Sequence, residues 1–168
     1  MTDIPSVDQL LPHDDPMILI DRAINVEALS IHCQVDIGAH NLFFNAESQT
    51  VPAYVGIEFM AQSVAAWSGY HALKNGTTPP IGFLLGSRRY KSLCDEFTQG
   101  QTLDIYAEQL MEDSGMAVFT ARVEDQGELV AQCQLNVYVP TEQKLQEMKT
   151  RAHHDPSGFS HRCQQRHW

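Results

Sequence analysis

Long apolar runs and cysteine motifs are both scarce in this sequence of 168 residues. No stretch approaches the roughly 18 apolar residues that indicate a membrane-spanning helix, and no basic region followed by an apolar segment opens the chain. We therefore expect a cytoplasmic protein with no membrane partner. Scattered cysteines without a C-x-x-C spacing predict reduced thiols: Cys33, Cys94, Cys133 and Cys163.

Positive charge is scarce as well. The chain carries 11 Lys and Arg against 21 Asp and Glu, a formal net charge of −10. Because nucleic-acid binding depends on neutralising phosphates, this balance argues against a nucleic-acid partner. Residues 1–140 carry the apolar patterning and are long enough for a single domain. Residues 141–168 show no apolar periodicity and are expected to form a largely disordered C-terminal extension.

The apolar pattern predicts one buried helix and a set of strands. Residues 53–74 contain no proline and only two charged residues, and small or apolar residues lie on nearly every side, which is typical of a buried helix. Runs that end at turn signals predict strands at residues 16–26, 29–37, 81–91, 102–111, 116–124 and 128–139. We therefore expect an α+β fold in which an antiparallel sheet wraps one long helix, with a homodimer that covers the open sheet edge.

Glu58, near the start of this helix, is the strongest chemical candidate. Burial raises the pKa of such a carboxyl group and the helix N-terminus lowers it, and a group balanced between these effects suits general acid–base chemistry. The alternative is a carboxylate that only caps backbone N–H groups. Gln62 lies one turn later on the same face, where it either lines a binding pocket or is satisfied by backbone groups. The free N–H groups of Ala53 and Tyr54 at the helix start are candidates for polarising a substrate carbonyl.

Loop histidines and a basic cluster are the remaining candidates. His13 and His40 lie in predicted loops, where catalytic groups often occur, and a structural role is the alternative for each. Arg88, Arg89 and Lys91 stand out because basic residues are rare elsewhere in the first 140 residues. On a strand, the second and third would share one face and the first would lie on the other. The cluster predicts either a docking patch for an acidic partner or a solvated group of charges.

Two separated motifs resemble those of a known enzyme family. Residues 11–22, LPHDDPMILIDR, resemble the L-P-H-x-x-P-h-h-h-h-D-R opening of FabZ-type 3-hydroxyacyl-ACP dehydratases, and residues 56–62, GIEFMAQ, resemble their E-A-M-A-Q helix. The pattern G-F-L-L-G-x-R-x-Y at residues 82–90 is more similar to the ApeP-like branch, associated with aryl-polyene lipid synthesis. The resemblance covers residues 5–140. It implies the hotdog fold, a long helix wrapped by an antiparallel sheet and paired into dimers or dimers of dimers.

The resemblance also implies roles for individual residues. The family's catalytic glutamate on the central helix corresponds to Glu58, the glutamine that follows it to Gln62, and the histidine of the opening motif to His13. The proline before the helix corresponds to Pro52, and the N–H group that binds the oxyanion to Ala53. No cofactor and no metal are implied.

One departure from the family pattern concerns the catalytic base. FabZ-type enzymes carry this base in a G-H-F-P loop, and counting back from the helix places residues 43–46, Phe-Phe-Asn-Ala, at that point. The histidine is therefore missing. If the loop has a different length here, His40 is the candidate base, and otherwise His13 is.

The resemblance implies removal of water from 3-hydroxyacyl thioesters on acyl carrier protein, in fatty-acid or aryl-polyene synthesis. Glu58 would be the acid and a loop histidine the base, while the basic cluster would meet the acidic carrier. Two alternatives remain open. One is an acyl-thioesterase on the same fold, and the other is a non-catalytic, carrier-binding subunit that pairs with an active hotdog chain.

Overall fold

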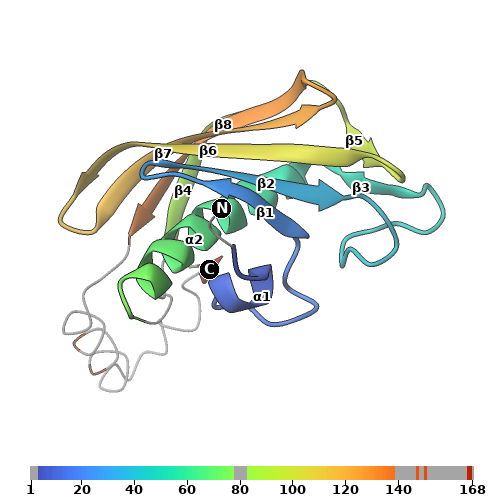
Figure 1. The fold of residues 1–168 in the computed structure, drawn as a ribbon. Helices are drawn as coiled ribbons and strands as arrows, with labels where there is room; N and C mark the ends of the chain where they lie inside the picture. Colours follow the sequence, from blue (N-terminus) through green and yellow to red (C-terminus); the bar gives the residue numbers. More distant parts are fainter. Residues whose placement is uncertain (1–3, 78–82, 139–146, 148–149, 151–165, 168) are drawn as a thin grey trace.

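The computed structural model describes residues 4–77, 83–138, 147, 150, 166 and 167. The elements follow one another as α1 (Val7–Leu10), β1 (Arg22–Val26), β2 (Ser30–Asp36), β3 (Thr50–Pro52), the 3-10 helix η1 (Ala53–Val55), α2 (Gly56–Lys74), β4 (Phe83–Ser92), β5 (Glu96–Thr98), β6 (Thr102–Asp113), β7 (Met116–Asp125), β8 (Glu128–Tyr138) and β9 (Arg166–His167). The predicted α+β architecture, one long helix against an antiparallel sheet, is confirmed (Figure 1).

The main sheet is antiparallel throughout, with the strand order β1-β2-β6-β7-β8-β4-β9 in the described residues. The alternation predicted for residues 29–37 is confirmed, because buried and half-buried positions alternate along all of β2. In this arrangement one sheet face carries the buried apolar side chains and meets α2, while the other carries most of the polar ones.

The long helix is buried as its sequence predicts. Residues 59–66 of α2, more than two full turns, are buried without interruption, and the helix becomes exposed only towards Lys74. Figure 1 shows α2 lying against the sheet, with α1 beside it. The two helices touch through backbone, because a Cβ atom on Gly69 would lie 1.9 Å from the carbonyl oxygen of Leu10. Glycine is required at this crossing because no larger residue leaves space for the neighbouring chain.

The strand predicted for residues 16–26 is only half correct, since β1 begins at Arg22. In the preceding segment, backbone groups of Met17 and Leu19 bond to a side chain instead of to a neighbouring strand. The N–H of Leu19 donates to Oε1 of Gln62 at 2.8 Å, and Nε2 of Gln62 donates to the carbonyl of Met17 at 2.7 Å. These bonds hold the segment against α2, so it does not extend the sheet.

The sequence did not predict three short strands, β3, β5 and β9, and one predicted strand is irregular. β3 and β5 form a separate two-stranded sheet, in which Val51 pairs with Phe97. In β4 the register with β8 shifts between Arg88 and Lys91, and Arg89 has a φ of 58°. At this bulge two residues of β4 lie against one residue of β8, so the strand is not regular there, and the predicted faces of the three basic side chains stay a prediction.

The C-terminal extension falls mostly outside the described residues, so its predicted disorder stays a prediction. Arg166 and His167 are described, and they pair with Leu84 and Phe83 of β4. Within the described part of the chain, no helix has the length and apolar character needed to cross a bilayer.

Candidate active site

Two short elements lead directly into the long helix. β3 ends at Pro52, η1 covers the next turn, and α2 begins at Gly56. The N–H of Ala53 donates to the carbonyl of Asp95 at 3.1 Å, which extends the pairing of β3 with β5 by one bond. The prediction that this N–H is free for a substrate carbonyl is therefore wrong. The next N–H, that of Tyr54, has no hydrogen-bond acceptor among the described residues, and its side chain is exposed.

The carbonyl of Ala53 accepts two hydrogen bonds. One comes from the N–H of Gly56, and the other from the hydroxyl of Tyr90 on β4. A Cβ atom on Gly56 would lie 2.9 Å from that hydroxyl oxygen, so glycine lets the tyrosine approach the helix start. Burial raises the pKa of the Tyr90 hydroxyl above its ordinary value, which keeps it protonated and able to donate at neutral pH.

Glu58 lies in the first turn of α2 and is half-buried, next to the positive end of the helix dipole. It is the carboxyl group that the sequence singled out. Glu58 lies one helical turn before Gln62, and it follows Tyr54 by four residues. A backbone donor in η1 is thus followed, about one turn later, by a carboxyl group in α2.

Gln62 is buried, and both ends of its amide bind the backbone of the segment from Met17 to Leu19. This is the backbone-satisfied alternative of the sequence interpretation rather than the substrate-binding one. The amide fixes the loop that follows His13 against α2, one turn beyond Glu58. His13 itself is half-buried in that loop.

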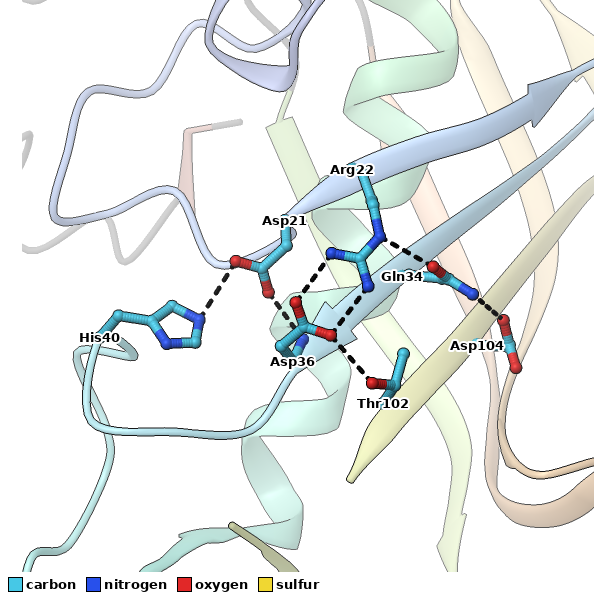
Figure 2. Close-up of polar contacts among 7 residues, drawn as sticks. All are labelled: Asp21, Arg22, Gln34, Asp36, His40, Thr102 and Asp104. Atoms are coloured by element: carbon cyan, nitrogen blue, oxygen red, sulfur yellow. Dashed lines mark hydrogen bonds and ion pairs between the residues drawn. The ribbon is translucent and has the colours of Figure 1, made fainter. Parts of the chain in front are cut away.

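His40 belongs to a polar network at the end of β1 and β2, which Figure 2 shows. Its Nε2 lies 3.1 Å from Oδ1 of Asp21, and 53% of its side chain is exposed. Oδ2 of Asp21 accepts the backbone N–H of Asp36 at 2.7 Å, which holds the carboxylate in place. The histidine ring is therefore oriented by an acid that is itself fixed.

The same network contains a bidentate ion pair. Both terminal nitrogens of Arg22 donate to the carboxylate of Asp36, at 2.7 and 2.8 Å. This hydrogen bonding from Arg22 lowers the pKa of Asp36 below its ordinary value. At Asp104, burial raises the pKa of the carboxyl group. Hydrogen bonds from Gln34 and His32 outweigh this effect, so the pKa lies below its usual range.

The basic cluster lies on β4, which is next to the edge of the main sheet that lies farthest from β1. Arg89 and Lys91 are exposed, and the side chain of Arg88 lies outside the described part of the structure. The cluster belongs to the strand that carries Tyr90, so the same strand contacts the helix start and presents positive charge beside it.

Two contacts at the candidate site were missed by sequence reasoning. Tyr90 was quoted only as part of a motif, yet its hydroxyl reaches the helix start across 37 residues of sequence. Asp21 was likewise quoted only as part of a motif. Its contact with His40 forms only when the segment before β1 and the loop after β2 lie side by side. The resemblance of the surrounding residues to a family motif was the only available signal, because neither contact leaves a periodic pattern in the sequence.

Comparisons with known proteins agree with this architecture. The model of the ApeP-like family, described as ApeP dehydratase, matches residues 5–150. The solved dehydratase heterocomplex ApeI:P from Xenorhabdus doucetiae contains a chain with 32% identity and a TM-score of 0.79, and the match covers 86% of this chain and 97% of that one.

Curated relatives point to the same group of enzymes. The 3-hydroxyacyl-[acyl-carrier-protein] dehydratase FabZ of Thiobacillus denitrificans is 30% identical over 141 residues, which cover 79% of this chain and 94% of that protein. FabZ of Shewanella woodyi is 26% identical over 139 residues, or 79% and 89% of the two chains. A hypothetical thioesterase from Streptococcus pneumoniae shares the hotdog fold alone, with a TM-score of 0.56, 11% identity and coverage of 70% and 86%. The chain has the hotdog fold and belongs to the ApeP-like family of dehydratases.

Proposed function

We propose that this chain is a subunit of a dehydratase that removes water from 3-hydroxyacyl thioesters carried by acyl carrier protein. The observation that carries the proposal is the nearness in the chain of two groups: the Glu58 carboxyl group in the first turn of α2, and the Tyr54 N–H in η1, directly before α2, which has no acceptor in the described chain. The names of the FabZ relatives supply the substrate class.

The reaction needs a proton removed from C2 and a hydroxyl group removed from C3. In our proposal a histidine takes the C2 proton, and the electron pair left behind forms the C2–C3 double bond. Glu58 gives its proton to the departing hydroxyl, which leaves as water. The Tyr54 N–H binds the thioester oxygen, where negative charge develops when the C2–H bond breaks. The chain's own groups thus account for every proton.

We assign the base to His40, supported by its contact with Asp21. A carboxylate that accepts a hydrogen bond from one ring nitrogen fixes the tautomer and leaves the other nitrogen able to accept a proton. His13 is the competing candidate, because Gln62 fixes its loop beside the helix turn that follows Glu58. Single substitutions of the two histidines by asparagine separate these assignments.

We further propose that a different hotdog chain is the partner. β4 lies next to the sheet edge, and among the described residues only Arg166 and His167 pair with its outer side, at Leu84 and Phe83. Along the rest of β4, no described strand pairs with this outer side, and proteins normally cover such backbone groups. The solved relative named above is a heterocomplex of two dehydratase chains. Native mass spectrometry of the chain alone and mixed with a candidate partner distinguishes a homodimer from a heterocomplex.

Carrier docking is assigned to the exposed side chains of Arg89 and Lys91, together with Arg88. Acyl carrier proteins are acidic, so a local positive patch on an otherwise acidic subunit favours their approach at low ionic strength. Reversing the charge of Arg89 and Lys91 is expected to raise KM for the carrier-bound substrate more than KM for a pantetheine thioester.

Intact-mass spectrometry of a 3-hydroxyacyl carrier protein tests the reaction class. The substrate is incubated with the purified chain, with and without its partner. Loss of one water from the acyl group supports the dehydratase. Loss of the whole acyl group indicates a thioesterase and contradicts the proposal. Unchanged mass with the complete assembly, combined with tight carrier binding, assigns the chain to a non-catalytic role.

A further inference from the structure

The peptide that joins Ala53 to Tyr54 has two ends in very different surroundings. Its carbonyl accepts hydrogen bonds from the Tyr90 hydroxyl and from the N–H of Gly56. Its N–H, which belongs to Tyr54, has no acceptor among the described residues. The peptide therefore has a carbonyl that accepts two hydrogen bonds and an N–H without an acceptor among the described residues.

Geometry links these two ends. A trans peptide is planar, and its N–H points in the direction opposite to its C=O. A side chain that fixes the direction of the carbonyl therefore fixes the direction of the N–H as well. Hydrogen bonds to the carbonyl also polarise the peptide, which strengthens its N–H as a donor.

We propose that Tyr90 is a positioning residue, which aims and strengthens the Tyr54 N–H for the carbonyl of a bound acyl thioester. This inference rests on the proposed dehydratase function and identifies a group outside the helix that prepares the oxyanion donor. Tyr90 does not touch the substrate in this account, and it acts only through the peptide that it holds.

A strand bulge and a neighbouring glycine allow Tyr90 to make this contact. Between Arg88 and Lys91, β4 places two residues against the single residue Cys133 of β8, and such a bulge redirects a side chain. Tyr90 is part of that bulge and is half-buried. Gly56 leaves the space in which its hydroxyl reaches the carbonyl. A Cβ atom at position 56 would lie 2.9 Å from the hydroxyl oxygen, so a larger residue there would force the hydroxyl to shift.

Replacing Tyr90 by phenylalanine tests the proposal, because it removes the hydroxyl and keeps the ring. Loss of a direct oxyanion donor typically lowers kcat about 100-fold or more, so loss of a group that only aims the donor is expected to lower kcat about tenfold. KM should change less than about twofold, since the donor acts mainly on the developing charge. Tyr106→Phe is the matched control, because Tyr106 stacks on His32 on the other face of the sheet.

A spectroscopic measurement separates positioning from a structural effect. The probe is a butanoyl pantetheine thioester labelled with carbon-13 at the carbonyl, which cannot be dehydrated and can be added to the active assembly. Its carbonyl stretch should shift to lower frequency when bound to the wild type and to Tyr106→Phe, and most of that shift should disappear in Tyr90→Phe. A bound carbonyl frequency that is the same in Tyr90→Phe and wild type would overturn the proposal.

The proposed dehydratase function and the positioning role of Tyr90 can be disproved separately. If the wild-type assembly dehydrates no 3-hydroxyacyl carrier protein, the proposed function fails, and the infrared shift still reports whether Tyr90 controls a carbonyl-binding donor. If dehydration proceeds and Tyr90→Phe keeps a kcat within twofold of wild type, Tyr90 has no positioning role and the proposed function stands. A fall in kcat with a normal infrared shift also overturns the inference.

Discussion

Replacing Gln62 by methionine should destabilise the fold far more than its modest change in shape suggests. The substitution keeps the length of the side chain and removes both amide partners of the loop at Met17 and Leu19. The Leu19 N–H is buried and would lose the one acceptor that it has among the described residues, and the Met17 carbonyl is partly buried. Each such orphaned group costs about 1–3 kcal/mol, and water partly compensates the second, so we expect a total loss of about 2–4 kcal/mol.

For a chain of this length, that loss corresponds to a fall in Tm of about 5–15 °C. Differential scanning calorimetry and urea unfolding measure it, with Gln99→Met as the control, because Gln99 is exposed. The control should unfold within about 0.5 kcal/mol of the wild type. A loss below 1 kcal/mol for Gln62→Met, with a large rise in KM instead, would refute the structural role and restore a substrate-binding one.

Three further outcomes follow from the packing and charges. Gly69→Ala should destabilise by about 1–3 kcal/mol in urea unfolding, despite alanine's better helix propensity, because its Cβ meets the Leu10 carbonyl; an equal or higher Tm would contradict this. Arg22→Met should lower Tm at pH 6. The difference in Tm from the wild type should shrink as the pH falls below about 4, because protonation of Asp36 removes the ion pair that lowers its pKa and stabilises the fold. A difference in Tm that does not depend on pH would argue against this ion pair. Burial raises the pKa of the Cys33 thiol to about 12, so iodoacetamide should modify it only on unfolding, as peptide mapping would show.

The long helix and the central strands could be predicted because their signals are local. Glu58 is the only charged residue in the helix before Lys74, and β2 alternates without interruption. The strand at residues 16–26 was overestimated for an equally physical reason. Its apolar residues have strand propensity, yet the amide of Gln62, 43 residues away from Leu19, takes the hydrogen bonds that a neighbouring strand would have received.

The candidate site was predicted in outline and corrected in detail. Glu58 stands at the helix start as expected, whereas the N–H of Ala53 is occupied by Asp95. That bond depends on β5, a strand of three residues that is too short to leave a pattern in the sequence. The Tyr90 hydroxyl bond depends on a bulge in β4, and bulges are set by tertiary packing rather than by local propensity.

The most direct test of the account is the rate at which Glu58→Gln converts a 3-hydroxyacyl carrier protein to the enoyl form, compared with Glu47→Gln. Glu47 is an exposed carboxylate in the loop before β3, so its amide variant should keep the wild-type rate. General acid catalysis is worth about 100- to 10,000-fold, and we expect the Glu58 variant to lose at least 100-fold in kcat with an unchanged Tm. A Glu58→Gln assembly that dehydrates its substrate within threefold of the wild-type rate would contradict the central claim.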